Sequence, residues 1–216
     1  MRKALVSLGS GPQARLLRLA RSTFGPFARR HGYDLHMYDA PLDESRPAPW
    51  SKVVALQRLQ SDYDLLLWLD ADLMIVDGRE DIVLELEEGR FLYLVEHSTK
   101  EGRMPNSGVM LLRTGEDCRS FLSALWAEED LIDHTWWENA AICRLLGYEL
   151  DPPRPVRPTE WLERTKFISG RWNSIHDAPS ARPRVRHYPG YSQRTRTAFM
   201  SRDLVATAIR RRLGRA

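Results

Sequence analysis

Two aspartates interrupt an apolar stretch of the chain, and their types and spacing point to metal chemistry. Asp70 and Asp72 lie within residues 65–76, and all the remaining residues of this stretch are hydrophobic. Two carboxylates this close repel each other, and burying them is costly unless a cation lies between them. Carboxylate oxygens suit Mg²⁺ and Mn²⁺, which keep coordination positions open for substrate phosphates. The spacing therefore indicates a divalent-cation site.

A simpler interpretation of the same residues is that Asp70 caps a turn and Asp72 is solvated. The flanking residues favour the cation site, because nothing local explains two acids inside an apolar run. Residues 65–69 form a continuous apolar segment, typical of a central strand buried on both faces. A strand that ends in Asp-x-Asp places both carboxylates at the carboxyl edge of a parallel sheet, where open α/β folds bind ligands.

The rest of the chain supplies the elements of an α/β fold. Predicted strands at 3–8 and 35–38 flank a segment, 14–28, in which apolar residues recur at helical spacing and which Gly25-Pro26 would bend or split. This order predicts a mostly parallel central sheet flanked by helices. Further strands are predicted at 91–95, 109–112 and 185–188, and further helices at 51–60, 118–126, 139–146 and 202–213. In the last helix Leu204, Val205, Ala208, Ile209 and Leu213 share one predicted face.

Composition and charge exclude several classes of protein. With 43% hydrophobic residues and only 2 cysteines, the 216-residue chain is neither disordered nor a disulfide scaffold. We find no apolar run of the roughly 20 residues that a membrane span needs and no secretory signal, so we expect a cytoplasmic protein. The net charge of +3 gives no indication of nucleic-acid binding. No feature sets an oligomeric state.

Four further stretches place polar residues beside predicted elements. Their residues, in chain order, are Lys52, Asn106 and Gly108, Glu138 behind Trp136 and Trp137, and His187 and Gly190 followed by Arg194 and Arg196. Each has a simpler explanation: surface arginines are usually solvated, a helix-terminal acid complements the helix dipole, and tryptophans anchor helices in a core. The motifs gain weight from their order along the chain.

In that order the motifs resemble those of GT-A fold glycosyltransferases, nearest to the galactosyl-, mannosyl- and xylosyltransferases of family 34. The resemblance runs from residues 31–34 to Gly190 and departs at Glu138-Asn139, where an Asp-Gln pair is usual. It implies a metal-dependent, retaining transfer of a hexose or pentose from a nucleotide-diphosphate sugar to a hydroxyl acceptor, whether a glycan, a lipid-linked acceptor or a small molecule. We expect one domain over 1–216, with a donor half (1–112), an acceptor and active-site half (113–200) and a basic helix (201–216).

The resemblance also implies a role for each motif. Asp70, Asp72 and His187 would hold Mn²⁺ or Mg²⁺, with a UDP-sugar favoured over a GDP-sugar as donor. Asn106, Asp70 and Glu138 would lie at the reacting atoms. Glu138 would act either as a nucleophile or, as we favour, by orienting the donor sugar. Further donor contacts would come from Ser7, Leu8, Gly9, Lys52, Ala71, Gly108, Gly190 and Arg194.

Two other functions stay open at this point. The altered Glu138-Asn139 pair favours a binding module that kept the fold and lost turnover. A haloacid-dehalogenase-type phosphatase also places Asp-x-Asp after a strand, but there Thr or Val usually stands where this chain has Met74. Separately, Arg210–Arg212 and Arg215 on the last helix would suit an anionic membrane or a lipid-linked acceptor, or would complement the helix dipole.

Overall fold

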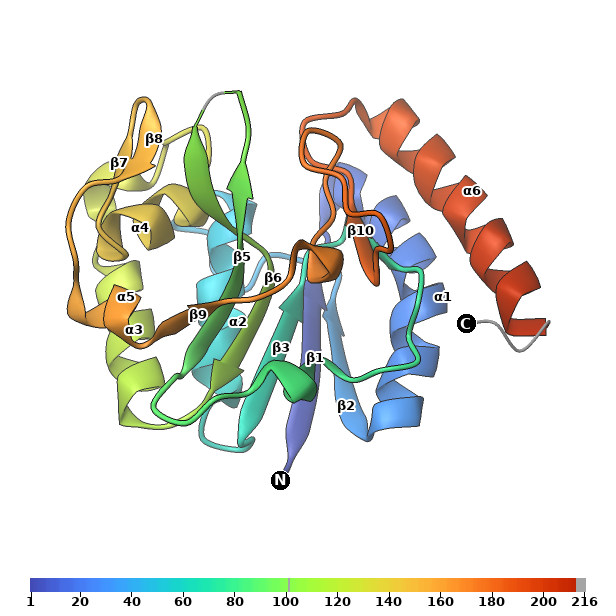
Figure 1. Cartoon of the computed structure of the whole chain (residues 1–216), viewed down its shortest axis with the longest axis horizontal. Coiled ribbons are helices and arrows are strands. Elements are labelled where there is room, and N and C mark those ends of the chain that lie inside the picture. Colours follow the sequence, from blue (N-terminus) through green and yellow to red (C-terminus); the bar gives the residue numbers. More distant parts are fainter. Residues whose placement is uncertain (101, 213–216) are drawn as a thin grey trace.

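A mixed sheet runs through the middle of the molecule (Figure 1). The computed structural model describes residues 1–100 and 102–212, and within them the sheet has six strands in the order β2-β1-β3-β6-β5-β9. The strands are β1 (Lys3–Leu8), β2 (Tyr33–Tyr38), β3 (Leu65–Leu69), β5 (Leu92–Ser98), β6 (Arg103–Arg113) and β9 (Thr165–Phe167). Pairing is parallel for β1–β2, β1–β3 and β5–β9, and antiparallel for β3–β6 and β5–β6. The predicted α/β class is confirmed, with a more mixed sheet than expected.

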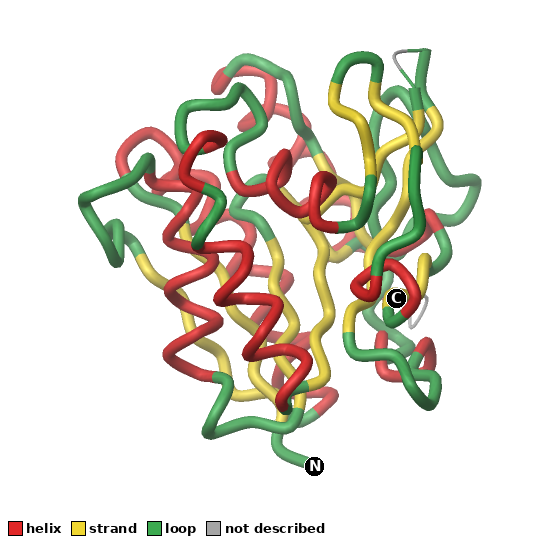
Figure 2. Tube along the Cα trace, turned by 90° about the vertical axis from the view of Figure 1, so that its left-hand side faces the viewer, coloured by secondary structure: helices red, strands yellow, loops and turns green. Residues whose placement is uncertain are grey.

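Helices cover both faces of this sheet. The helices are α1 (Ala14–His31), α2 (Ser51–Leu59), α3 (Glu116–Trp126), α4 (Glu138–Leu145), α5 (Glu160–Glu163) and α6 (Gln193–Arg212), with 3-10 turns at Gly11–Gln13, Ala48–Trp50, Ile82–Glu85, Glu129–Leu131 and Gly170–Trp172. Two small antiparallel pairs complete the fold: β4 (Leu73–Ile75) with β10 (Val185–His187), and β7 (Tyr148–Leu150) with β8 (Pro153–Pro155). Figure 2 shows the helices lying beside the strands when the molecule is turned by 90°.

Two hydrophobic cores explain why β3 is apolar throughout. Leu66 and Trp68 pack with α2, α3 and α4 on one face, whereas Leu65, Leu67 and Leu69 pack with α1, β4 and β10 on the other. Alternate residues of a strand point to opposite faces, so a strand covered on both sides must be apolar at every position. The buried β3 therefore forms a rigid support for the two aspartates that follow it.

The predicted elements are mostly present, with differences that have tertiary causes. The strands at 3–8 and 65–69 are confirmed, and Gly25-Pro26 does not split α1, which continues to His31. Strand β6 begins at Arg103, not Val109, because the hairpin with β5 extends it beyond the sheet edge (Figure 1). The strands absent from the sequence prediction are β4, β7, β8 and β9, each three residues long, and the helix absent from it is α5, which has four residues.

Helix α6 differs most from its prediction. It begins at Gln193 and buries Met200, Asp203 and Thr207, whereas Val205 is 60% exposed and Ile209 is 53% exposed. The predicted apolar face is therefore turned to solvent at Val205 and Ile209, and Leu213 lies outside the described residues. Asp203 is buried because it accepts hydrogen bonds from the Arg186 guanidinium and the Tyr188 hydroxyl. In the part of the chain that the structure describes, no helix is both long and apolar enough to cross a membrane.

Candidate metal centre and active site

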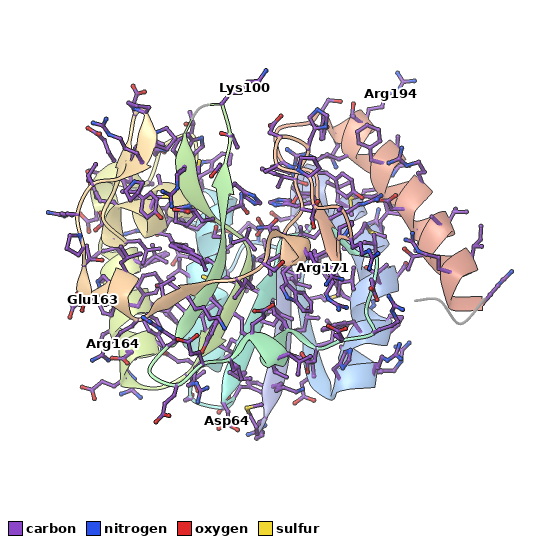
Figure 3. The ribbon with its side chains drawn as sticks, in the orientation of Figure 1. Asp64, Lys100, Glu163, Arg164, Arg171 and Arg194 are labelled. Atoms are coloured by element: carbon purple, nitrogen blue, oxygen red, sulfur yellow. The ribbon has the colours of Figure 1, made fainter. Side chains whose placement is uncertain are left out.

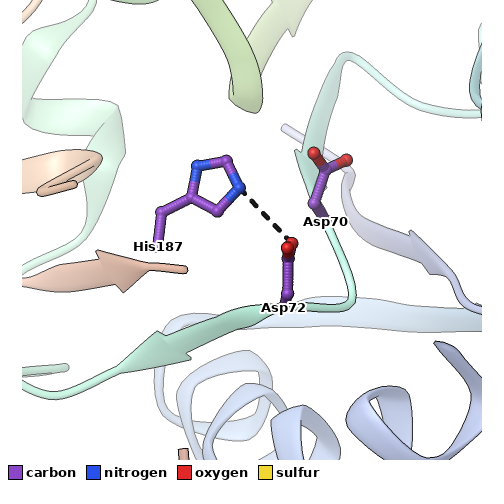
Figure 4. Close-up of side chains that lie close together, drawn as sticks. All are labelled: Asp70, Asp72 and His187. Carbon is purple, nitrogen blue, oxygen red and sulfur yellow. Dashed lines mark ion pairs between the residues drawn. The ribbon is translucent and has the colours of Figure 1, made fainter. Parts of the chain in front are cut away.

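The fold brings Asp70, Asp72 and His187 together although Asp72 and His187 lie 115 positions apart in the sequence. Both aspartates follow the end of β3, and the antiparallel pair β4–β10 sets His187 opposite Leu73, directly after Asp72. One ligand atom from each of the three residues lies within 4.8 Å of the others. Figure 4 shows the three side chains close together, with the His187 ring directed toward Asp72. Asp72 and His187 are buried, and Asp70 is half-buried. Two carboxylates and an imidazole are a suitable set of ligands for Mn²⁺ or Mg²⁺.

The orientation of the His187 ring supports its use as a metal ligand. Its Nδ1 lies 3.0 Å from the Oδ1 of Asn173, and the Nδ2 of Asn173 donates to the Oδ1 of Asn106 at 2.8 Å. Because the amide oxygen of Asn173 faces the ring, Nδ1 carries a proton and donates it. The other nitrogen, Nε2, faces the Oδ1 of Asp72 at 3.3 Å. A nitrogen lone pair and a carboxylate at this distance require a proton or a cation between them, so the site fits a metal.

Gly108 leaves the space that the His187 ring occupies. A Cβ at position 108 would lie 2.4 Å from the Cε1 of His187, so any side chain there would displace the ring. The β5–β6 register explains how Gly108 reaches this place: Leu94 pairs with Met110, but the next residue, Val95, pairs with Asn106. Residues 107–109 thus form a bulge, and the Asn106 Oδ1 accepts a hydrogen bond from the Gly108 amide at 2.9 Å. The Asn-x-Gly motif therefore shapes the metal centre.

A second cluster lies beside the first and is built around a buried lysine. The Nζ of Lys52, on α2, lies 2.6 Å from the Oε1 of Glu138 and 3.1 Å from the Oδ1 of Asp70. It also donates to the carbonyl and hydroxyl oxygens of Ser107 at 3.2 and 3.0 Å. Burial alone would lower the pKa of Lys52, but Asp70 and Glu138 reverse that effect and raise it. Lys52 therefore stays charged and fixes both acids. The Nε1 of Trp68 donates to the same Asp70 oxygen at 2.6 Å.

Glu138 presents one free oxygen to this cluster. The residue is 5% exposed, and within residues 1–100 and 102–212 its Oε2 has no hydrogen-bond partner. Burial raises the pKa of the Glu138 carboxyl, and the Lys52 ammonium offsets that effect in part. An unpartnered buried carboxylate oxygen is costly, which is typical of an atom that meets a ligand.

The residues on either side of Glu138 hold it in place. Trp137, which is 41% exposed, has a φ of 46°, a conformation that non-glycine residues rarely adopt. On the other side, Asn139 accepts from the Ser107 amide at 2.8 Å and donates to the Pro105 carbonyl at 3.3 Å. The two neighbouring residues therefore have different roles. Glu138 binds Lys52, and Asn139 fixes the bulge next to the candidate metal centre.

The loop after β1 lies against the aspartate turn. A Cβ on Gly9 would lie 2.9 Å from the Cβ of Ala71, so only glycine allows this close approach. Ser7 is buried with an unpartnered hydroxyl among the described residues, and Leu8 is half-buried. The structure thus places Ser7, Leu8 and Gly9 at the same sheet edge as Ala71.

The segment after His187 brings only some of its expected residues to the site. Gly190 is exposed and has a φ of 75°, which explains the glycine by conformation and not by crowding. Arg194 is exposed and points away from the body of the molecule at the start of α6 (Figure 3). Arg196 instead approaches the metal centre, with its Nη1 at 3.3 Å from the Oδ2 of Asp72. The arginine that meets the cluster is thus Arg196, and Arg194 does not.

Sequence reasoning missed Asn173 and Ser107. Asn173 is fully buried and links the imidazole of His187 to the amide of Asn106. The available signal was an asparagine between Trp172 and Ser174, a short polar break among aromatic residues. Ser107 stood inside a motif already singled out, but its hydrogen bonds to Lys52 depend on tertiary structure.

Comparison with solved structures identifies the fold. No protein-family model matches the sequence, and no curated protein matches it. A glycosyltransferase involved in the glycosylation of the major capsid of PBCV-1 aligns with a TM-score of 0.73 at 15% identity, covering 94% of this chain and 100% of that one. Galactosyltransferase LgtC, solved with donor and acceptor sugar analogues, aligns with a TM-score of 0.60 at 11% identity over 92% and 95% of the two chains. Glycosyltransferase GlyE of Streptococcus pneumoniae TIGR4 aligns with a TM-score of 0.56 at 14% identity over 95% and 63%.

These similarities confirm the GT-A fold predicted from the motifs. They also remove the haloacid-dehalogenase alternative, since the chain has a different fold. The identities are too low to assign a family, so family 34 stays a prediction.

Proposed function

We propose that this chain is a metal-dependent glycosyltransferase that moves a sugar from a nucleotide-diphosphate donor to a hydroxyl acceptor. The observation that carries the proposal is the convergence of Asp70, Asp72 and His187 within 4.8 Å, at an edge of a GT-A fold. The glycosyltransferase structures that share this fold support the same conclusion. In this proposal the chain acts as one domain over 1–216.

Asp70, Asp72 and His187 would hold Mn²⁺ or Mg²⁺, which would stabilise the negative charge on the leaving diphosphate. The chain's own residues prepare that position. Asn173 fixes the His187 ring, and Lys52 fixes Asp70, so two of the three ligands are oriented before a cation arrives. Side chains that are already oriented in this way need little rearrangement when a cation binds.

Glu138 orients the donor sugar in this proposal. Its Oε1 is committed to Lys52, and its Oε2 is the free acceptor for a sugar hydroxyl. A nucleophilic role is less consistent with an ammonium 2.6 Å away, because the ion pair lowers the electron density available for attack. The Asn106 Oδ1 is occupied by Asn173 and Gly108, which leaves its Nδ2 to donate to the sugar. The proposed transfer retains the anomeric configuration, as the resemblance to family 34 implies.

The donor site draws on both halves of the chain. Ser7, Leu8 and Gly9 line the edge where the nucleotide base would bind, and a UDP-sugar is favoured over a GDP-sugar. In this proposal the metal ligands Asp70 and Asp72 come from the donor half, 1–112, and His187 comes from 113–200, the acceptor and active-site half.

A thermal-shift screen tests the donor site. UDP, GDP, ADP and dTDP are each added with and without Mn²⁺. A ligand at 100 times its dissociation constant adds about 2.7 kcal/mol, which raises the melting temperature of a domain this size by about 5–10 °C. We expect that rise with UDP only when Mn²⁺ is present, and no rise in Asp72→Asn. No Mn²⁺-dependent rise with any nucleotide contradicts the proposal.

We also propose that α1 and α6 meet an anionic membrane surface that carries a lipid-linked acceptor. The two helices pack together. Their exposed arginines are Arg15, Arg18, Arg21, Arg29 and Arg30 on α1, and Arg194, Arg202 and Arg212 on α6. In residues 14–31 and 193–212 the one acid is Asp203, which is buried and paired with Arg186. Val205 and Ile209 are exposed among these arginines and suit contact with lipid. Arg215 lies outside the described residues.

Co-sedimentation with vesicles tests this contact. Each arginine near an anionic surface contributes about 1 kcal/mol at moderate salt. We expect binding to vesicles with 30% phosphatidylglycerol and not to pure phosphatidylcholine, and a clear loss in Arg202→Gln/Arg212→Gln. The control Arg113→Gln/Arg119→Gln removes equal charge elsewhere on the surface and should bind normally. Equal binding by both variants refutes the proposed surface.

A further inference from the structure

Each carboxylate oxygen of Asp72 faces a nitrogen atom of another side chain. The Oδ1 lies 3.3 Å from the Nε2 of His187, and the Oδ2 lies 3.3 Å from the Nη1 of Arg196. The Arg196 side chain is 18% exposed, and its Nε has no hydrogen-bond partner in the part of the chain that the structure describes. A partly buried guanidinium whose Nε is unpartnered, and whose one ion-pair partner among the described residues is Asp72, is not fully satisfied where it lies.

We propose that Arg196 occupies the cation position beside Asp72 in the metal-free protein and is displaced when the divalent ion binds. This inference rests on the proposed function of the site. A guanidinium and a divalent cation repel each other, so they cannot share the Asp72 carboxylate at full strength. Arg196 therefore lowers the affinity of the site for the divalent ion alone. The ion binds at full affinity only when the guanidinium can bind another anion.

The structure lets Arg196 move without disturbing the rest of α6. Arg196 lies in the first turn of the helix, just after Gly190. The helix is anchored further along, where Asp203 binds Arg186 and Tyr188. A change of rotamer in a long side chain is then enough to free Asp72, and the helix axis stays in place.

The donor's diphosphate is the anion that receives the displaced guanidinium. Arginine binds phosphate oxygens through paired, charge-assisted hydrogen bonds, and the metal centre sets the diphosphate beside Asp72. Arg196 thus opposes the metal alone and favours the metal together with the nucleotide, which couples the two binding events. Arg194 carries the same charge two residues earlier but points outward, so it has no part in this exchange (Figure 3).

Mn²⁺ titration with and without UDP tests the exchange directly. Free Mn²⁺ is followed by electron paramagnetic resonance, and UDP binding at saturating Mn²⁺ by calorimetry. We expect Arg196→Gln to bind Mn²⁺ about tenfold more tightly than the wild type when UDP is absent, and to bind UDP about tenfold more weakly when Mn²⁺ is saturating. Arg194→Gln, which removes the same charge from the same helix, should stay within about twofold of the wild type in both measurements.

The two opposite effects separate this inference from a structural role. Arg196→Lys keeps the charge and should bind Mn²⁺ as the wild type does, which also covers the case in which Arg196→Gln folds poorly. Unchanged or weaker Mn²⁺ binding in Arg196→Gln, or unchanged UDP affinity, overturns the inference while leaving the proposed function intact. A wild-type protein that binds no Mn²⁺ even with UDP overturns both.

Discussion

Lys52 neutralises two acids inside the protein, so its removal should be costly. Its ammonium contacts Glu138 and Asp70 and is 3% exposed. Lys52→Met keeps the length and volume of the side chain and removes the charge. Breaking a buried ion pair by removing one partner costs about 3–5 kcal/mol. In a domain of this size each kcal/mol shifts the melting temperature by about 2–4 °C, so we expect a fall of about 10 °C at pH 7.

The pH dependence of this loss identifies its cause. Burial already raises the pKa of Glu138, and without Lys52 it rises further. A carboxyl whose folded pKa exceeds its unfolded value of about 4.3 favours the folded state below that pH, and this contribution disappears as pH rises through the folded pKa. The stability difference between Lys52→Met and wild type should therefore be small near pH 4 and grow towards pH 7.

Urea unfolding at pH 4, 5.5 and 7 measures this difference. Lys52→Met/Glu138→Gln should recover about 2 kcal/mol relative to Lys52→Met at pH 7, because the uncompensated charge is gone. Lys166→Met, which removes a half-exposed lysine, is the control and should cost less than about 1 kcal/mol. A loss below about 1 kcal/mol for Lys52→Met, or one that does not change with pH, refutes the account of this cluster.

Three further predictions follow from single contacts. Gly108→Ala places a Cβ against the His187 ring and should weaken Mn²⁺ binding at least tenfold by calorimetry. A Gly170→Ala control, where no atom lies within 4 Å of the added Cβ, should bind Mn²⁺ normally. Asn173→Ala leaves the Nδ1 of His187 unpartnered and should reduce Mn²⁺ affinity by about 10- to 100-fold; unchanged affinity would show that the ring is held by packing alone. Hydrogen bonds from Arg79 lower the pKa of Asp77 to about 2, so Asp77→Asn should reduce the free energy of unfolding in urea by about 1 kcal/mol at pH 6. This loss should shrink as pH falls from 4 towards 2, because the Asp77 carboxylate of the wild type is then protonated. A loss that stays constant with pH would contradict this account.

The parts of the fold that sequence predicts are those governed by local pattern. The all-apolar run 65–69 is typical of a strand covered on both faces, and the two acids that follow it pointed to the candidate metal centre. The start of β6 could not be predicted in this way. Asn106 and Gly108 are poor strand formers, and only the pairing with β5 across a bulge holds them in a strand.

Helix α6 shows where pattern fails altogether. Its apolar residues Val205 and Ile209 share one helical face, yet the helix turns that face outward and buries Asp203. The reason is the pair formed by Asp203 with Arg186 and Tyr188, residues in and beside β10. The same rotation of the helix brings Arg196 to Asp72 and turns Arg194 away. The sequence alone does not show which of these two arginines faces Asp72.

The measurement that tests the central claim most directly is nucleotide release from sugar donors. Purified wild-type protein and Asp72→Asn are incubated with UDP-glucose, UDP-galactose, UDP-N-acetylglucosamine and UDP-xylose, and with GDP-mannose, in Mn²⁺ or in EDTA, and the free nucleoside diphosphate is quantified. We predict release from at least one donor by the wild type, dependent on Mn²⁺ and lost in Asp72→Asn. Nucleotide binding without release would mean that the chain is a binding module with this fold. Release that persists equally in EDTA or in Asp72→Asn would contradict the metal centre described above.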